Sequence, residues 1–230
     1  MEAIILAGGK AERLGDAAGG SPKALVEVGG RPLIAYQVAQ LAAAGVERVI
    51  VSCSAGRGEE FVRALVSIGP EIVPAEEPEP LGRGGGIRFA ARSYRGGDVY
   101  ALNGDELVDI DLGALLARHR ASGAAATITV VPLQSPFGIV DLDGHDFVTG
   151  FREAPRLPHW VSCGVYVLGD DALDRFPERG DHETSTFPEL AAERRLGAYR
   201  HEGTWITVNT PKDLRRAQEY LAERPGWLQA

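Results

Sequence analysis

Two kinds of apolar spacing alternate along the first half of the chain. Short runs dominated by apolar residues, which favour buried strands, occupy residues 3–7, 48–52, 71–74 and 99–102. Between them, apolar residues recur at helical spacing over residues 32–44, 59–68 and 85–95. Strands that alternate with helices predict βαβ units and a mostly parallel sheet. We therefore predict an α/β fold in which helices flank a mixed, mostly parallel sheet.

The pattern changes after residue 122. Strand-like segments follow one another at residues 125–132, 138–141, 147–151 and 161–168. Asp143-Gly144, between the middle two, is typical of a hairpin turn. Helical patterns cover residues 112–121, 186–195 and 211–223, with short strands at 198–201 and 204–208. Asp111 and Thr210 are the predicted caps of the first and last of these helices, and Pro211 favours a first helical turn. Because no repeat or linker interrupts the chain, we predict a single domain over residues 1–230, with halves of about 1–122 and 123–230.

Composition narrows the class of protein. The 230-residue chain carries a net charge of −8, which argues against a general nucleic-acid-binding surface. No apolar stretch is long enough to span a bilayer, and the N-terminus lacks the features of a signal peptide, so we expect a cytoplasmic protein. Cys53 and Cys163 each lie in or beside an apolar run, so we expect reduced, partly buried thiols rather than a disulfide or zinc site.

The end of the first predicted strand carries the most informative chemistry. The apolar run ends in Gly8-Gly9, Arg13 follows on the loop, and Pro22-Lys23 comes after a stretch rich in glycine and alanine. A strand-like run at residues 24–28 follows Lys23. Glycines after a strand let the backbone approach a ligand closely, and two converging cations indicate a polyphosphate. The segment matches neither the P-loop nor the three-glycine dinucleotide motif. A glycine turn with two surface cations is the alternative interpretation.

A carboxylate follows the fourth predicted strand. Asn103, Gly104 and Asp105 come directly after residues 99–102, at the kind of strand end where open parallel sheets bind ligands. Beside a phosphate loop, Asp105 is a natural Mg²⁺ ligand, because Mg²⁺ takes one or two carboxylates plus substrate phosphates. Asn209, at the end of another predicted strand, is the candidate second ligand. The alternative for both is an ordinary turn residue.

Two further segments are weaker on their own. Residues 81–87 hold four glycines at the start of a predicted helix, which permits close approach to a base or ribose. Residues 137–140, 151–155 and 162–166 are candidate walls of an acceptor pocket. Taken alone, the first segment is a flexible loop and the others are core strands.

Taken together in their order along the chain, these segments resemble the sugar-1-phosphate nucleotidyltransferases, and most closely the mannose- and heptose-1-phosphate guanylyltransferases. The similarity runs from Glu2 to Leu221. The family's Leu-Ala-Gly-Gly-x-Gly-Thr-Arg-Leu motif corresponds to residues 6–14, with Ala11 and Glu12 in place of Gly-Thr. The resemblance implies Mg²⁺-dependent transfer of a nucleoside monophosphate (NMP) from a nucleoside triphosphate (NTP) to a sugar 1-phosphate. It also implies a Rossmann-like domain without the left-handed β-helix extension of some relatives.

By this resemblance the site residues fall into three groups. Arg13, Lys23 and Asp105 are the implied catalytic residues, and Asp105 with Asn209 the implied metal ligands. The implied nucleotide-binding residues are Leu6, Ala7, Gly8, Gly9, Glu77, Gly82, Asn103 and Gly104. The implied sugar-phosphate-binding residues are Gly138, Glu153, Ser162 and Arg156.

The base is predicted from residues 76–80. Pyrimidine-specific relatives carry a glutamine here, and this chain has none. Guanine presents the N1 hydrogen and the N2 amino group side by side, and a carboxylate accepts from both. We therefore predict GTP as donor, with Glu77 contacting the base and Glu76 as the second candidate. Exposed loop acids are the alternative.

The departures from the family pattern leave the acceptor open. This chain has Ala154 where the family has lysine and Ser162 where it has asparagine. It also has Arg83 where the family has threonine and Thr207 where it has aspartate. The lost lysine favours a sugar other than glucose, such as a heptose, with Arg83 or Arg156 as the replacement cation. A molybdenum-cofactor or phosphocholine cytidylyltransferase and a catalytically silent nucleotide-binding subunit remain alternatives. We expect no nucleic-acid or membrane partner, and a homodimer is left open.

Overall fold

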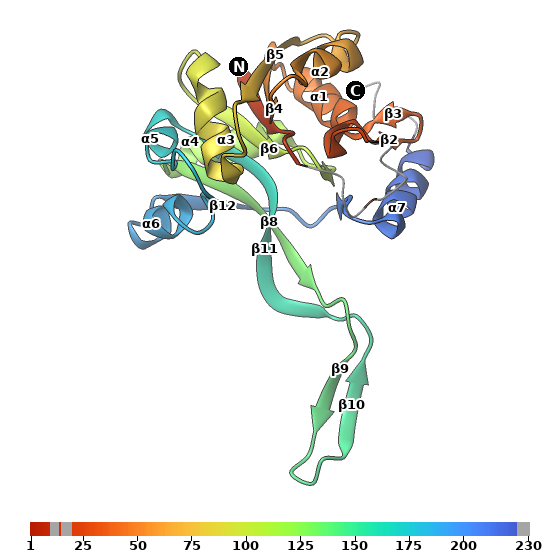
Figure 1. Cartoon of the computed structure of the whole chain (residues 1–230). Helices are drawn as coiled ribbons and strands as arrows, with labels where there is room; N and C mark the ends of the chain where they lie inside the picture. The colour runs from red at the N-terminus through yellow and green to blue at the C-terminus, as the bar shows by residue number, and fades with distance from the viewer. Residues whose placement is uncertain (10–13, 15–19, 225–230) are drawn as a thin grey trace.

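The computed structural model describes residues 1–9, 14 and 20–224, and its centre is a seven-stranded sheet of order β12-β8-β11-β6-β1-β4-β5 (Figure 1). Its strands are β1 (Glu2–Leu6), β4 (Arg48–Ser54), β5 (Glu71–Glu77), β6 (Val99–Asn103), β8 (Ala126–Gln134), β11 (Arg156–Leu168) and β12 (Leu196–Arg200). Strands β5, β4, β1 and β6 run parallel, while β11 is antiparallel to both β6 and β8. The predicted α/β fold with a mixed, mostly parallel sheet is confirmed.

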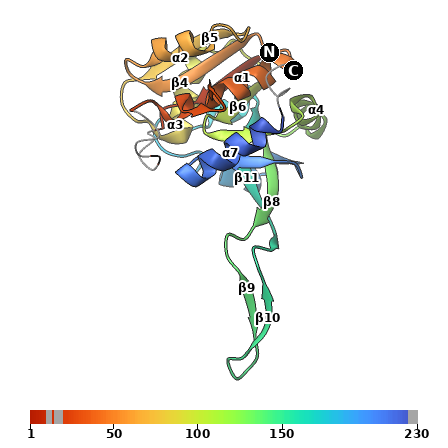
Figure 2. The ribbon, with the colours of Figure 1, turned by 90° about the vertical axis from the view of Figure 1, so that its right-hand side faces the viewer.

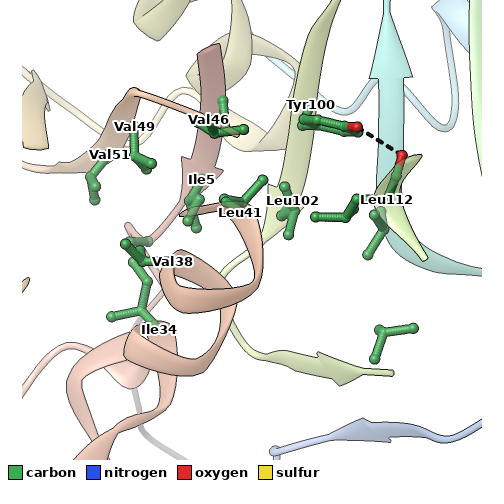
Figure 3. Close-up of a cluster of buried hydrophobic side chains, with 14 of the residues drawn as sticks. Ile5, Ile34, Val38, Leu41, Val46, Val49, Val51, Tyr100, Leu102 and Leu112 are labelled. Atoms are coloured by element: carbon green, nitrogen blue, oxygen red, sulfur yellow. Dashed lines mark hydrogen bonds between the residues drawn. The ribbon is translucent and has the colours of Figure 1, made fainter. Parts of the chain in front are cut away.

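Helices cover both faces of this sheet. They are α1 (Leu33–Ala43), α2 (Gly58–Leu65), α3 (Gly82–Ala90), α4 (Leu112–Ser122), α5 (Asp170–Asp174), α6 (Thr186–Ala192) and α7 (Pro211–Ala222). Strand alternation divides the core: Ile5 packs with α1, α2 and α4, whereas Ile4 packs with α3, α5 and α6. Figure 3 shows the first of these clusters, where the hydroxyl of Tyr100 donates a 2.7 Å hydrogen bond to the carbonyl of Leu112.

The predicted helix caps are confirmed. The Asp111 side chain accepts a 2.9 Å hydrogen bond from the backbone N–H of Ala114 at the start of α4. Thr210 and Asp213 form a reciprocal capping box at the start of α7, with Pro211 in its first turn. These caps satisfy backbone donors that the first helical turn leaves unpaired.

The structure corrects one predicted strand and adds short elements. Residues 24–28 are not one strand: Lys23–Leu25 forms a 3₁₀ helix, before the short hairpin of β2 (Glu27–Val28) and β3 (Arg31–Pro32). A second 3₁₀ turn, Ala91–Ser93, follows α3. The short strand β7 (Glu106–Val108) pairs antiparallel with β13 (Trp205–Thr207), which brings the C-terminal part of the chain to the end of β6.

The predicted hairpin projects away from the rest of the molecule. Strands β9 (Ile139–Leu142) and β10 (Val148–Arg152) form their own two-stranded sheet beyond the ends of β8 and β11. Figures 1 and 2 show this segment from two sides, extending well clear of the sheet and helices. We call residues 135–155 the arm and the remainder the body. Among the helices that the described residues form, none is long and apolar enough to cross a membrane.

Candidate active site

A cavity of about 790 Å³ lies at the carboxyl ends of the parallel strands. The ends of β1, β5 and β6 meet there because these strands run in the same direction. Eleven residues singled out from the sequence line it: Leu6, Ala7, Gly8, Gly9, Lys23, Glu77, Gly82, Asn103, Gly104, Asp105 and Asn209. The structure therefore brings together residues up to about two hundred positions apart in the sequence.

Three polar side chains converge in one part of the cavity. The ammonium nitrogen of Lys23 lies 2.5 Å from Oδ2 of Asp105 and 2.5 Å from Oδ1 of Asn209. The side chain of Lys23 is largely buried, at 11% exposed, and that of Asp105 is 31% exposed. Oxygens of Asp105 and Asn209, from separate strand ends, thus face a single point, and the ammonium of Lys23 occupies that point.

Thr207 sets the orientation of the Asn209 amide. Its hydroxyl accepts a 2.6 Å hydrogen bond from Nδ2 of Asn209, which leaves Oδ1 facing Lys23. The resemblance placed an aspartate at position 207. Threonine removes that carboxylate and holds the neighbouring amide oxygen toward the cluster instead.

Glu106 is a cavity residue that sequence reasoning missed. It lies directly opposite Thr207 in the β7–β13 pair and is only 8% exposed. Its carboxylate accepts a 2.7 Å hydrogen bond from the indole nitrogen of Trp205. Burial, with the adjacent negative charge of Asp105, raises the pKa of Glu106 to about 8, although hydrogen bonds from Trp205 and Thr207 oppose the shift. The sequence signal was its place next to Asp105.

The donor set fits a hard divalent cation. Asp105 and Asn209 offer one carboxylate and one amide oxygen, the oxygen ligands that Mg²⁺ prefers. The described residues contain no group of three or more histidine, cysteine, aspartate or glutamate side chains suited to a metal. A site for Mg²⁺ would therefore depend on phosphate oxygens of the substrate for its remaining ligands, as is usual for Mg²⁺ at nucleotide sites.

Glu77 lies at the end of β5 on another wall of the cavity. It is 9% exposed, and its two oxygens accept hydrogen bonds from the hydroxyl of Ser52 (2.7 Å) and the backbone N–H of Leu81 (3.1 Å). These contacts hold the carboxylate in place and leave each oxygen able to accept a further bond.

Glu76, the second candidate, is placed differently. Its oxygens accept hydrogen bonds from the backbone N–H groups of Gly56 (2.8 Å) and Gly58 (2.9 Å) at the start of α2. These bonds lower the pKa of Glu76, and the residue does not line the cavity. The prediction for Glu76 is wrong, because successive strand residues point to opposite sides.

The glycines of α3 serve packing rather than close approach to a ligand. A Cβ atom would collide with the backbone of residues 178–182 at Gly82, Gly84 and Gly85, and with Leu6 and Glu77 at Gly86. The interpretation of the whole stretch as a surface for a base or ribose is therefore wrong for residues 84–86. Gly82 alone of these four lines the cavity.

The same packing brings an ion-pair cluster to the cavity. The guanidinium of Arg83 lies 3.3 Å from Asp181 and 2.9 Å from Glu183, and both Arg83 and Asp181 line the cavity. The Arg83 guanidinium holds the pKa of Asp181 below its usual range through hydrogen bonding and charge. No sequence motif linked positions 83 and 181, because their contact depends on how the loop before α6 crosses α3.

The remaining predicted site residues lie elsewhere. Arg13 falls outside the described residues. Gly138 and Glu153 are in the arm, and Arg156 follows at its base, 3.5 Å from Glu202. Ser162 is half-buried in β11, opposite Val130 of β8. The structure does not bring these four acceptor residues into the cavity lining, so their role remains a prediction.

Comparison with known proteins agrees with this geometry. A family model for nucleotidyl transferases matches residues 2–224. The mannose-1-phosphate guanylyltransferase of Mycobacterium tuberculosis is 33% identical over 232 residues, covering 96% of this chain and 64% of that protein. The mannose-1-phosphate guanyltransferase of Candida albicans is 33% identical over 227 residues, covering 93% of this chain and 62% of that protein.

The chain thus spans just under two thirds of the length of these curated relatives. Among solved structures, HddC from Yersinia pseudotuberculosis, complexed with GMP-PN, superimposes with a TM-score of 0.73. It is 23% identical, and the alignment covers 96% of this chain and 99% of that one, so it shows a shared fold. Because the family model extends over nearly all of the sequence, the chain belongs to the nucleotidyl transferase family.

Proposed function

We propose that this protein transfers GMP from GTP to a sugar 1-phosphate, forming a GDP-sugar and releasing pyrophosphate. The observation that carries the proposal is one cavity with two chemically distinct walls. Lys23, Asp105 and Asn209 meet on one wall, and the fixed carboxylate of Glu77 lies on another. The first wall suits a metal-bound triphosphate and the second a base with two adjacent donors.

The chemistry asks the protein chiefly for placement and charge. A sugar phosphate is already anionic, so its oxygen attacks the α-phosphorus of the donor without a strong general base, in line with the departing pyrophosphate. Mg²⁺, held by Asp105 and Asn209, would stabilise negative charge on the phosphate oxygens. Lys23 supplies a further positive charge beside that site, and Arg13 is predicted to grip the triphosphate.

Lys23 also provides for the state without nucleotide. Its ammonium bridges Asp105 and Asn209, so two oxygens that would otherwise face the cavity unpaired are satisfied. Entry of a metal-bound triphosphate would free the ammonium to contact phosphate. The same lysine thus organises the site before binding and balances charge during transfer.

The donor base is assigned to guanine through Glu77. Uracil presents acceptors on either side of its single donor, so a carboxylate there would face oxygen. Adenine offers one donor beside one acceptor. A charge-assisted pair lost on a buried edge costs roughly 1.5–3 kcal/mol, which amounts to about tenfold or more in discrimination.

The acceptor is assigned to a mannose- or heptose-type sugar 1-phosphate. The relatives above are named for mannose 1-phosphate, and Ala154 removes the lysine that the family places on the sugar phosphate. Arg83 lines the cavity and is the better placed of the two candidate replacement cations. We place the reaction in the cytoplasm, where the free, buried thiols of Cys53 and Cys163 stay reduced.

Initial rates of pyrophosphate release with a panel of substrates test the proposal. Donors would be GTP, ATP, CTP, UTP and dTTP, and acceptors mannose, heptose and glucose 1-phosphates together with phosphocholine. We expect the highest kcat/KM for GTP with a mannose or heptose 1-phosphate, dependent on Mg²⁺. A preference for CTP with phosphocholine, or GTP binding without turnover of any acceptor, would replace it with one of the alternatives.

A further inference from the structure

The arm exposes an unusual concentration of apolar side chains. Eight large hydrophobic residues are exposed among the described residues, and seven of them lie between positions 137 and 160. They are Phe137, Val140, Leu142, Phe147, Val148, Phe151 and Trp160, with Val66 the exception. None of the seven belongs to a hydrophobic cluster of the described chain.

The hairpin sorts these side chains onto one face. Val140 pairs with Phe151, and Leu142 pairs with Val148, so all four share the same side of the two-stranded sheet. They are between 45% and 64% exposed. Gly138 continues this face, and its lack of a side chain makes room for the ring of Phe151.

The opposite face is mostly polar, and its apolar member, Ile139, lies across from Arg152. Asp141 and Arg152 form an ion pair at 2.6 Å, and Gly150 lies across from Asp141. Beyond them, the Asp143 side chain accepts from the backbone N–H groups of His145 and Phe147 within the turn. The arm is therefore amphipathic, with only one face lacking a polar or packed environment.

Such a hairpin is not expected to persist alone in water. An isolated pair of strands is at best marginally stable and needs a further layer over its apolar face. Val140, Leu142, Val148 and Phe151 together offer on the order of 300–400 Å² of exposed surface on this face. The largest apolar patch of a monomer has about this size and is often functional, and it amounts to about half of the roughly 800 Å² that a standard interface buries on each partner.

We propose that the apolar face of the arm packs against the same face of a second copy of this chain. Two amphipathic hairpins related by a two-fold axis bury matching apolar faces and form a four-stranded sandwich with its polar faces outward. A second copy is present wherever the protein is, so it can cover the apolar face at all times, as a stable hairpin requires.

The charge of the arm argues against other partners. Residues 135–155 carry four acidic side chains (Asp141, Asp143, Asp146 and Glu153) and one basic one (Arg152). This net negative charge, on a chain that is itself at −8, opposes binding to anionic lipid surfaces and to nucleic acid. A like-charged copy remains suitable, because Asp143 and Asp146 lie in the turn and Asp141 lies on the polar face, while Glu153 alone lies beside Gly138 at the end of the apolar face.

Sedimentation velocity of the wild-type protein from about 1 to 100 μM tests the inference. We expect a concentration-dependent dimer, and we expect the double variant Val148→Asp with Phe151→Asp to sediment as a monomer. Val66→Asp, which alters an exposed hydrophobic residue at the end of α2, should dimerise normally. A wild-type monomer at every concentration, or a dimer unaffected by the double variant, would overturn the proposal.

Crosslinking provides a second measurement in a chain that keeps its apolar face largely intact. The native thiols of Cys53 and Cys163 are buried, so Val140→Cys or Leu142→Cys introduces one accessible cysteine. Mild oxidation should crosslink two copies through at least one of these positions and not through Asp141→Cys on the polar face. Equal crosslinking at position 141 would contradict packing through the apolar face. Cosedimentation with anionic vesicles that the double variant loses would contradict a second copy as the partner.

Discussion

The cavity end of the sheet and the arm both lie where strands of the central sheet end, but they present opposite kinds of surface. In the body, polar side chains at the ends of β5 and β6 are held in place by neighbours, as Ser52 and Leu81 hold Glu77. In the arm, the apolar side chains of β9 and β10 face outward with no layer above them. A preorganised polar surface suits a small charged ligand, whereas an uncovered apolar one suits a protein.

This comparison separates activity from association. Changes at the cavity should alter turnover or base choice and leave the oligomeric state unchanged. Changes on the apolar face of the arm should alter association first. The predictions below run from the largest expected effect to the smallest.

Asp105→Asn should have the largest effect on turnover. The substitution keeps the shape of the side chain but removes the carboxylate charge from the proposed metal site, so kcat should fall by about a hundredfold or more. The matched variant Asp143→Asn, in the turn of the arm, should stay within about twofold of wild type. Near-normal Mg²⁺-dependent turnover in Asp105→Asn would remove this residue from the mechanism.

Lys23→Ala should lower kcat by tens of fold. The ammonium is largely buried between Asp105 and Asn209, so its loss leaves their oxygens unbalanced and the phosphates without a nearby cation. Steady-state rates at saturating GTP measure the effect, with Lys212→Ala on the surface helix α7 as control. Equal rates in both variants would make Lys23 a structural cation only.

Lowering the pH should remove a stabilising contribution that His182 makes to the body, while Glu106, whose raised pKa acts in the opposite direction, contributes equally to the two proteins compared below. His182 is 0% exposed and stacks on Phe176, and neither ring nitrogen has a hydrogen-bond partner, with Nδ1 3.5 Å from Glu183. Burial, with the positive charge of Arg83, lowers the pKa of His182 from 6.5 to about 4. The unfolded chain therefore takes up a proton first as the pH falls through 6.5, and stability is lost until the pH reaches the folded pKa. From pH 7.5 to 5 this amounts to about 2 kcal/mol.

Denaturant titrations of wild type and His182→Phe at these two pH values check that prediction. The variant removes the titrating group from an aromatic environment and should lose about 2 kcal/mol less between pH 7.5 and 5. The same pH dependence in both proteins would show that other groups control acid stability.

Glu77→Gln should change base choice by about tenfold. Glutamine keeps the size of the side chain but replaces one acceptor oxygen with a donor amide, so the preference for GTP over UTP in kcat/KM should narrow. Glu76→Gln is the matched control, because Glu76 contacts α2 instead of the cavity. An unchanged ratio in Glu77→Gln would assign base recognition to other groups.

Arg83→Ala and Arg156→Ala test whether the cavity or the base of the arm binds the acceptor sugar phosphate. Arg83 lines the cavity but is half exposed and shared between Asp181 and Glu183, so its removal should raise the acceptor KM by only about three- to tenfold. Arg156 lies outside the cavity lining, and its removal should change that KM by less than about twofold. A larger effect at Arg156 would mean that the arm base reaches the acceptor.

Sequence reasoning succeeded where local pattern determined structure. Apolar runs and helix caps predicted the sheet, the major helices and the hairpin. These features depend on residues close together in the sequence, as when Asp111 and Thr210 cap the helices that follow them. Sequence reasoning also placed Asp105 and Asn209 at strand ends, which the antiparallel pairing of β7 with β13 brings together. Glu106 and Asp181 were missed because their importance depends on pairing with distant segments, at Thr207 and Arg83.

The glycines of α3 and the acceptor residues show the same limit. Glycine permits close approach by any neighbour, and sequence alone does not distinguish a ligand from the backbone of residues 178–182. Strands near Gly138 and Glu153 were predicted correctly as strands. Their direction away from the body was not predictable, because it follows from where β8 and β11 leave the sheet.

The most direct test of the proposed function is the identity and ratio of the products formed from GTP and mannose or heptose 1-phosphate. Phosphorus NMR and mass spectrometry of a single reaction would follow both. We predict a GDP-sugar and pyrophosphate in equal amounts, neither formed when the sugar phosphate is omitted. Formation of GDP and inorganic phosphate, or of GMP without a sugar nucleotide, would contradict nucleotidyl transfer to a sugar phosphate.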